Sequence, residues 1–267
     1  MATLTSTGIL HGDGTTVENY VTATKAIFAY GFIDLSTITT NVSNLVNSYG
    51  DVSLDTTGVG TTRWRLGGAG YGGDKAIFGY GNDYSVAVYN LTNLVTNLGV
   101  VGADITGVGT ARRNLAAAGY GNDKAIFGYG GDQYGNSLSM TNKVSNAGVV
   151  AAVTTGVGTA RISLAATTYD IDKAMFGFGL GAGMQNITNL VSNLGVVATD
   201  TSGVGTARYD LAAANYGGDK VIFGYGQPGG MPTLNMTNKV SNTGVVASDT
   251  TGIGTARAGP SASSYGS

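Results

Sequence analysis

The chain has 267 residues, 45 of them glycine, with 14 basic and 16 acidic side chains and a formal net charge of −2. It has no cysteine and one histidine, which excludes a disulfide framework, a thiol nucleophile and a multi-histidine metal centre. The charge balance, without any basic run, argues against a nucleic-acid partner, and no apolar run is long enough to enter and cross a membrane.

The N-terminal residues 1–23 are expected to form an arm that precedes the repeats described below. They lack the charged and apolar stretches of a signal peptide, so we expect a protein made in the cytoplasm. Residues 6–24 resemble a degenerate half-repeat. Gly8 precedes Lys25 by the spacing found in later copies, and Asp13 stands where those copies have arginine.

A repeat of about 49 residues occupies residues 24–267 and is marked by three short blocks. One block reads Lys-Ala-Ile-Phe-Gly-Tyr-Gly, with small variations, and begins at Lys25, Lys75, Lys124, Lys173 and Lys220. Another reads Gly-Val-Gly-Thr-Ala-Arg, with small variations, and ends at Arg63, Arg112, Arg161, Arg208 and Arg257. The third reads Thr-Asn-x-Val-Ser-Asn-x-Gly-Val-Val. A closing half-repeat covers residues 251–267.

The spacings within the repeat predict strands and hairpins. Each of the first four arginines precedes the next lysine by 12 residues, which hold a small-residue strand, a Gly/Asp turn and the start of the Lys strand. The connection from the Lys block to the Thr-Asn block has 9 or 11 residues, and a difference of two preserves the facing of a strand. The Lys strand is apolar throughout, which predicts cover on both faces. No helical stripe is present, so we expect an all-β chain.

One copy of the repeat carries a resemblance to a known family. The segment Arg208-Tyr-Asp-Leu-Ala-Ala-Ala-Asn-Tyr-Gly-Gly-Asp-Lys-Val-Ile-Phe-Gly-Tyr-Gly226 resembles a kelch strand pair, although Gly-Tyr-Gly replaces the usual di-glycine. The resemblance implies a kelch-like β-propeller of about five blades. The near-identical Gly-Tyr-Gly-x-Asp-Lys and Val-Ser-Asn-x-Gly-Val-Val segments also resemble structural proteins of tailed bacteriophages, which implies a location in the virion.

Two ways of closing the ring follow from the half-repeats at the termini. In the first, Arg257–Tyr265 pairs beside Lys25–Tyr30, so that N- and C-terminal strands close the ring and hide their edges. In the second, residues 6–24 stay in the ring and the C-terminal copy is free. The first is favoured because the C-terminal copy matches the repeat better. A spare strand could also add to a neighbouring subunit and give a homo-oligomer.

Several repeated residues have both a functional and a structural interpretation. The repeated arginines and lysines could line a channel that attracts an anion, but we expect ion pairs or hydrogen bonds between blades. The Gly-Val-Gly-Thr block could bind phosphate, but without a Gly-Lys-Ser/Thr ending it favours a turn between strands. The Asn-x-Ser/Thr sequences are expected to be polar strand-edge residues and begin at Asn41, Asn90, Asn186 and Asn235.

Four aromatic residues depart from the repeat and are candidates for ligand or partner binding: Trp64, Tyr84, Tyr89 and Tyr134. The tyrosines lie in or beside connections that vary, at one rim of the predicted ring, and variable loops on a constant scaffold are where recognition usually occurs.

The sequence predicts no catalytic, metal-binding or cofactor-binding residue. The cysteine and histidine ligands of a copper-radical oxidase and the Asp-box turns of a sialidase are both missing. We therefore expect a non-catalytic structural or adhesive propeller, associated with a phage tail or capsid, that contacts other virion proteins or a host-surface receptor through loops 82–91, 131–140 and 227–236. The alternative is a multivalent lectin that binds glycans with one shallow pocket per blade.

Overall fold

The computed structural model describes residues 3–5, 8–10, 16–17, 25–33, 38–47, 49–85 and 87–264, and every regular element in them is a β-strand. The expectations placed on Asp13 and Tyr265 fall outside these residues. The prediction of an all-β chain is confirmed. The strands are β1 (Thr3–Thr5), β2 (Gly8–Leu10), β3 (Thr16–Val17), β4 (Ala26–Phe32), β5 (Thr39–Val46), β6 (Gly67–Tyr71), β7 (Lys75–Gly79), β8 (Thr92–Val95), β9 (Ala116–Tyr120), β10 (Lys124–Gly128), β11 (Thr141–Val144), β12 (Ala165–Tyr169), β13 (Lys173–Leu180), β14 (Met184–Val191), β15 (Ala212–Tyr216), β16 (Lys220–Gly224) and β17 (Thr237–Val240).

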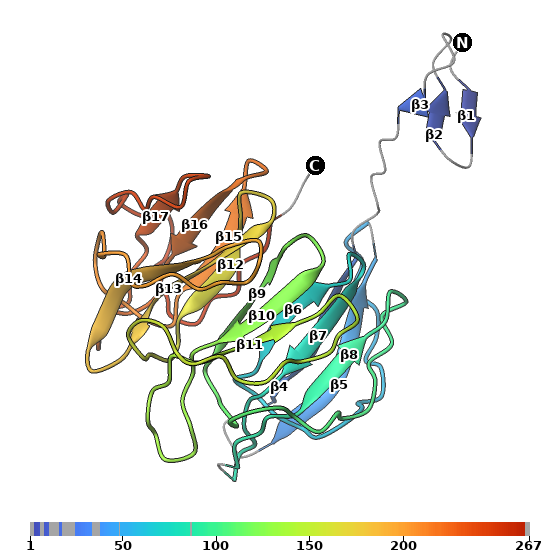
Figure 1. The fold of residues 1–267 in the computed structure, drawn as a ribbon, viewed down its shortest axis with the longest axis horizontal. Helices are drawn as coiled ribbons and strands as arrows, with labels where there is room; N and C mark the ends of the chain where they lie inside the picture. The colour runs from blue at the N-terminus through green and yellow to red at the C-terminus, as the bar shows by residue number, and fades with distance from the viewer. Residues whose placement is uncertain are drawn as a thin grey trace.

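The first three strands form a small sheet of their own. β1, β2 and β3 pair in that order, with Thr3 opposite Leu10 and Leu10 opposite Thr16. Among the described strands, none of the three pairs with a strand of the repeats, and Figure 1 draws them apart from the other sheets.

The repeats form five antiparallel sheets, which we number units 1 to 5 in chain order: β4–β5, β6–β8, β9–β11, β12–β14 and β15–β17. In unit 3, β9 and β10 form the predicted hairpin, with Lys124 opposite Tyr120 and Gly128 opposite Ala116. β11 pairs with the other edge of β10. Units 2, 4 and 5 have the same order, whereas the described residues contain no first strand of the hairpin for unit 1.

The connection of variable length preserves the pairing of the strands that it joins. It has 11 residues in unit 2 and 9 in unit 4, yet Gly79 pairs with Thr92 and Gly177 pairs with Thr188. In the shorter case the ladder continues until Leu180 meets Met184. The prediction that the two lengths keep the same strand facing is confirmed, because the third-strand asparagines are fully buried in units 2 to 5: Asn93, Asn142, Asn189 and Asn238.

An irregular fourth segment covers the outer edge of each third strand. In unit 3, isolated bridges join Thr141 to Thr154 and Val144 to Val150. The chain then passes through the Gly-Val-Gly-Thr block to Arg161, which begins the next unit. The block is therefore the crossover from the outer edge of one sheet to the inner strand of the next.

The apolar core lies between neighbouring units. Three clusters of buried side chains join units 2 and 3, 3 and 4, and 4 and 5. At the second of these interfaces, the rings of Tyr129 and Phe176 meet edge to face with centroids 5.1 Å apart. Gly128 permits this approach, because a Cβ there would lie 2.6 Å from Phe176 Cζ. Small residues thus let the sheets pack closely, since any side chain would hold them apart.

Unit 1 is the exception to the prediction that both faces of the Lys strand are covered. Phe28 on β4 is 61% exposed, whereas its counterparts Phe127, Phe176 and Phe223 have no exposed surface. The prediction therefore holds for β10 and β13 but is wrong for β4, where none of the described sheets covers the face that carries Phe28.

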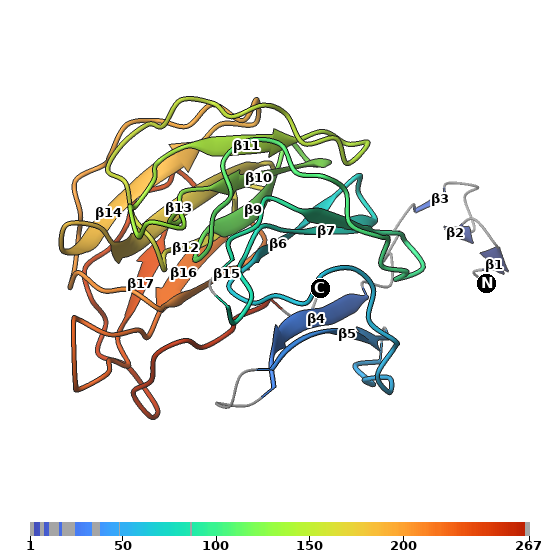
Figure 2. The same cartoon turned by 90° about the horizontal axis from the view of Figure 1, so that it is seen from below.

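The inner segments of the repeats line a channel of about 360 Å³. Figure 2 shows the units following one another in an arc. The lining residues are 68–70, 117–119, 166–168, 213–215 and 262–264. The expected pairing of the C-terminal half-repeat beside β4 is not present among the described residues, since residues 258–264 belong to no ladder.

Candidate functional site

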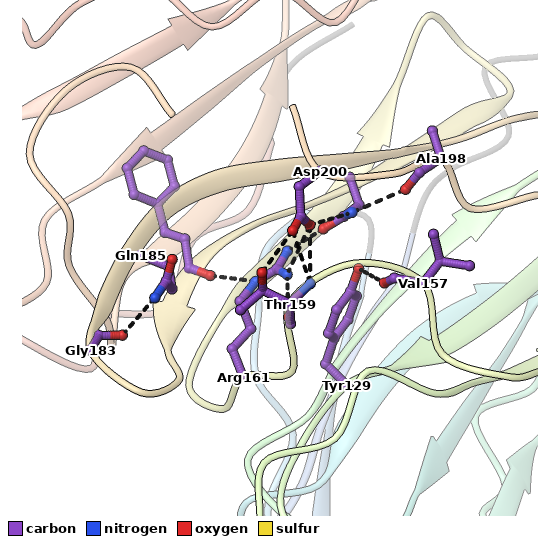
Figure 3. A network of polar contacts seen from close by, with 10 residues as sticks. Tyr129, Val157, Thr159, Arg161, Gly183, Gln185, Ala198 and Asp200 are labelled. Atoms are coloured by element: carbon purple, nitrogen blue, oxygen red, sulfur yellow. Dashed lines mark hydrogen bonds and ion pairs between the residues drawn. The ribbon is translucent and has the colours of Figure 1, made fainter. Parts of the chain in front are cut away.

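The buried repeat arginines fasten the start of each unit to the unit before it. Arg161 has no exposed surface, and its guanidinium lies over the ring of Tyr129, 4.2 Å from the centroid. It donates hydrogen bonds to the carbonyls of Phe178 (2.8 Å) and Thr159 (2.9 Å) and to Asn189 Oδ1 (2.6 Å). Figure 3 shows this network from close by. Burial raises the pKa of the Tyr129 hydroxyl to about 12, so this ring is neutral beneath the guanidinium.

The same arrangement recurs at the other repeat arginines. Arg63, Arg112 and Arg208 are equally buried, each over an aromatic ring of the preceding unit and bonded to a third-strand asparagine. Burial lowers the pKa of Arg208 to about 10. Arg257 lies 3.7 Å from the ring centroid of Tyr225 but is exposed. The channel wall, as far as it is described, contains no charged residue, so the arginines serve the contact between units.

A carboxylate completes the network at three of the four buried arginines, supplied by Asp104, Asp200 and Asp249. Asp200 Oδ2 accepts hydrogen bonds from the Thr159 amide (3.0 Å) and hydroxyl (2.7 Å), and Oδ1 accepts one from Asn189 Nδ2 (2.9 Å). Partial burial alone would raise the pKa of the Asp200 carboxyl, but these hydrogen bonds and the charge of Arg161 together hold it below its usual value. The carboxylate therefore ties the incoming crossover to the outer edge of its unit.

Unit 3 lacks this carboxylate because Val153 takes its place. A Cβ on Gly109 would lie 2.3 Å from Val153 Cγ2, just as a Cβ on Gly60 would lie 2.3 Å from Asp104 Oδ1. Arg112 donates instead to the Met140 carbonyl at 2.8 Å. The site tolerates the loss because a backbone acceptor lies within reach.

Asparagine side chains of the protein itself occupy the inside of the Gly-Val-Gly-Thr crossovers and hydrogen-bond to their carbonyl groups. Asn90 Nδ2 donates to the Gly109 carbonyl at 2.8 Å, and Asn186 Nδ2 donates to the Gly205 carbonyl at 2.6 Å. Asn41 and Asn235 make the same contact in their units. The side chains of the Asn-x-Ser/Thr sequences therefore hold a turn, and the crossover has no open cradle for a phosphate.

The repeat lysines of units 2 to 5 lie at the turn between the first two strands of the unit. Lys75 Nζ lies 2.8 Å from Asp74 Oδ1, with side chains 39% and 52% exposed. Lys124, Lys173 and Lys220 form similar contacts. Solvent screens exposed pairs of this kind, so each contributes little to stability. This rim therefore repeats one surface feature from unit to unit.

The opposite rim carries the residues that differ between repeats. The two residues after each buried arginine change from unit to unit, and the first of them bridges to the start of the variable connection. These bridges join Trp64 to Asn82, Arg113 to Gly131, Ile162 to Leu180 and Tyr209 to Gln227. We call the surface formed by these residues and the connections 82–91, 131–140, 180–184 and 227–236 the variable rim.

Two of the four predicted aromatic residues come together on the variable rim. Trp64 stacks on Phe32 with centroids 5.1 Å apart, and Phe32 stacks on Tyr84 at 6.2 Å. Arg65 lies over the Trp64 ring, 3.8 Å from its centroid. Because Phe32 and Arg65 already pack on Trp64, its ring is less open to a ligand than that of Tyr84, which is 50% exposed.

The other two predicted residues lie apart from this cluster and differ from each other. The Tyr89 hydroxyl donates to Asp83 Oδ2 at 2.8 Å, so this side chain braces its own connection. Tyr134 is 80% exposed in the connection of unit 3. The four predicted residues thus divide into Trp64, which its neighbours cover, Tyr89, which braces its own connection, and two exposed rings, Tyr84 and Tyr134.

The second residue after each buried arginine was not among the predicted site residues, although it lies beside the inner strands. These residues have positive φ and are joined by backbone hydrogen bonds, from the Asn114 amide to the Arg65 carbonyl (3.0 Å) and from the Ser163 amide to the Asn114 carbonyl (2.9 Å). Asp210 continues the series at 3.0 Å from Ser163. An alignment of the copies would have shown that this position holds a different residue in each unit: Arg, Asn, Ser and Asp. The arginine two residues earlier is the same in all four.

Searches for other kinds of site and for relatives were negative. Among the described residues, no three histidine, aspartate or glutamate side chains gather where they could hold a metal ion. The same residues include no helix with the length and hydropathy needed to span a bilayer. Comparison of the chain with models of known protein families and with curated protein sequences gives no match.

Proposed function

We propose that the chain is a non-catalytic structural or adhesive module, a kelch-like β-propeller carried on the tail or capsid surface of a phage virion. The observation that carries this proposal is the separation of the repeat into a constant interior and a variable rim. The buried arginine network recurs in units 2 to 5, whereas the residues beside it at one rim change in each unit. A rigid scaffold with variable surface positions is typical of a recognition module.

A closed ring of five units is the second part of the proposal. Gly226 N–H donates to the Arg257 carbonyl (2.9 Å) and Gly259 N–H to the Asp210 carbonyl (2.8 Å), in the pattern that links the earlier units. Residues 262–264 also line the channel beside the inner strands. The C-terminal segment thus continues toward the place of the strand that unit 1 lacks, which favours it over residues 6–24 as the closing copy.

Closure would cover surface that the described structure leaves open. Phe28 in unit 1 is 61% exposed and Tyr216 in unit 5 is 37% exposed, although their counterparts between the other units are almost fully buried. Burying apolar surface contributes about 25 cal/mol per Å². The two exposed rings therefore favour contact between units 1 and 5.

The partner of this module is a virion protein or a host-surface receptor that docks on the variable rim. Tyr84 and Tyr134 present open rings there, from the connections of units 2 and 3. Aromatic side chains are enriched among interface residues that carry most of the binding energy. Glycans remain the alternative partner, through stacking of sugar rings on these tyrosines.

The test is retention of the purified protein on phage particles and on host cells. Changing Tyr84 and Tyr134 to serine should weaken retention at least tenfold while the melting temperature stays within about 2 °C. Tyr49→Ser is the matched control, because Tyr49 is 89% exposed in a turn at the opposite rim. Equal retention of the double variant and the control would contradict the proposal. Binding of several related glycans on an array would favour the lectin, and antibody labelling in electron micrographs would locate the protein on the particle.

A further inference from the structure

The rim that carries the repeat lysines presents nearly the same surface in each of units 2 to 5. We call it the constant rim, formed by the turns 71–75, 120–124, 169–173 and 216–220 and the turns 96–100, 145–149, 192–196 and 241–245. The second turn reads Asn-x-Gly-Val in all four units. The variable rim, at the other end of the same strands, changes from unit to unit.

An aspartate joins the two turns of a unit on the constant rim. Asn97 Nδ2 donates to Asp74 Oδ2 at 3.1 Å, and Asp74 Oδ1 lies 2.8 Å from Lys75 Nζ. The same two contacts recur in unit 5, through Asn242, Asp219 and Lys220. Both oxygens of the carboxylate already have partners, so another protein can cover these charges without leaving them unpaired.

One exposed valine per unit accompanies these paired charges. The exposed fractions are 60–66% for Val100, Val149, Val196 and Val245. Leu98 and Leu194, in the same turns of units 2 and 4, are 73% and 75% exposed. Single exposed apolar residues are ordinary in soluble proteins, but one position exposed in four consecutive units forms an array typical of an interaction surface.

The charges of the constant rim make it complementary to a second copy of itself. Units 2, 3 and 5 each place one lysine ammonium beside one aspartate carboxylate. When two such rims face each other about a twofold axis, a lysine of one copy can lie against an aspartate of the other. A partner whose surface carries charge of one sign would be repelled by half of these groups.

The repetition of the constant rim favours the same partner. Two copies related by a twofold axis run around their interface in opposite directions, so units from different places in the chain face one another. The constant rim permits such pairs because its turns are alike in units 2 to 5. The variable rim does not, because the two residues after each buried arginine differ between units.

We propose that two copies of the chain associate through their constant rims, with the exposed valines in contact and the lysine and aspartate side chains of the two copies interleaved. The two variable rims then face away from each other, each open to a partner. The proposal requires units 2 to 5 alone, and depends neither on closure of the ring nor on what binds the variable rim.

Analytical ultracentrifugation of the purified protein at several concentrations tests this association. The unmodified protein should have twice the mass of one chain. Val149→Glu combined with Val196→Glu should weaken the association at least tenfold, because it places carboxylates in the contact. The circular dichroism spectrum should stay unchanged, since both valines lie in exposed turns.

Tyr134→Glu is the matched control for the valine variant, because Tyr134 is 80% exposed on the variable rim. It should keep the doubled mass. A single-chain mass for the unmodified protein at about 100 μM, where a micromolar contact is saturated, would overturn the proposal. Undiminished association of the valine variant, or an equal loss in the control, would also overturn it.

Exchange of the charges tests the pairing between copies. One variant carries Asp74→Lys, Asp123→Lys and Asp219→Lys, and the other carries Lys75→Asp, Lys124→Asp and Lys220→Asp. Each variant alone should remain a single chain, because like charges face each other, and an equal mixture should recover the doubled mass at low ionic strength. A mixture that stays as single chains, or a variant that still pairs with itself, would overturn the proposal.

Discussion

Replacing Val153 with aspartate should stabilise the protein, because it restores to unit 3 the carboxylate that units 2, 4 and 5 possess. Asp104 shows what the new group would do. It accepts hydrogen bonds from the Thr61 amide (2.8 Å) and hydroxyl (2.7 Å) and from Asn93 Nδ2 (2.9 Å). In unit 3 the corresponding donors are Thr110 and Asn142.

The magnitude follows from the contacts of Asp104. A hydrogen bond to a charged group contributes about 1.5–3 kcal/mol when shielded, but the Asp104 side chain is 24% exposed, which reduces each contribution. The substitution also removes two partly buried methyl groups, a loss of about 0.8 kcal/mol for each one fully buried. We expect a net gain of about 1–2 kcal/mol in the free energy of unfolding and a rise of about 2–6 °C in melting temperature.

The gain should depend on pH in a definite direction. Partial burial raises the pKa of the Asp104 carboxyl, but the hydrogen bonds from Thr61 and Asn93 lower it further, so the folded pKa lies below the ordinary value. A carboxyl with a lowered folded pKa adds stability above its unfolded pKa of about 3.9 and loses it as the pH falls through the folded pKa. The stabilisation by Val153→Asp should therefore be complete at pH 7 and should decrease as the pH falls below the unfolded pKa of about 3.9.

Thermal unfolding of Val153→Asp and Val153→Asn at several pH values provides the assay. Asparagine has nearly the shape of aspartate without the charge, so its effect should be smaller and should not change between pH 7 and pH 2. The reciprocal change Asp200→Val should destabilise unit 4 at pH 7. A lower melting temperature for Val153→Asp at pH 7, or a gain that does not decrease as the pH falls from 7 to 2, would refute the reasoning.

Three further predictions concern the network, the crossover and the closing segment. Arg161→Ala should lower the free energy of unfolding by about 3–5 kcal/mol because buried acceptors lose their donor, whereas the exposed Arg257→Ala should change it by no more than about 0.5 kcal/mol in denaturant titrations. Gly60→Ala should reduce the melting temperature, since φ is +80° and the new Cβ would lie 2.3 Å from a carboxylate oxygen. Deleting residues 257–267 should reduce it by more than deleting residues 1–20, and equal losses in calorimetry would contradict closure by the C-terminal copy.

The strand pattern of a unit could be predicted from the sequence because it depends on local periodicity. Twelve residues between an arginine and the next lysine allow one hairpin, and the pairing of Lys124 with Tyr120 follows from it. The tolerance of 9- and 11-residue connections is equally local, since side chains alternate with a period of two. The exposure of Phe28 could not be predicted, because it depends on which sheet lies beside β4.

The identity of the repeated residues was determined by the sequence alone, but their roles were decided by contacts across long separations. Arg161 meets Asn189 and Tyr129, which lie 28 and 32 positions away in opposite directions along the chain. Residue spacing does not show that a cation is fully buried, because burial requires the neighbouring unit. The same limit explains why Arg65 and Asp210 were missed as rim residues: only the stacking of units brings one position of each repeat to the same end of the channel.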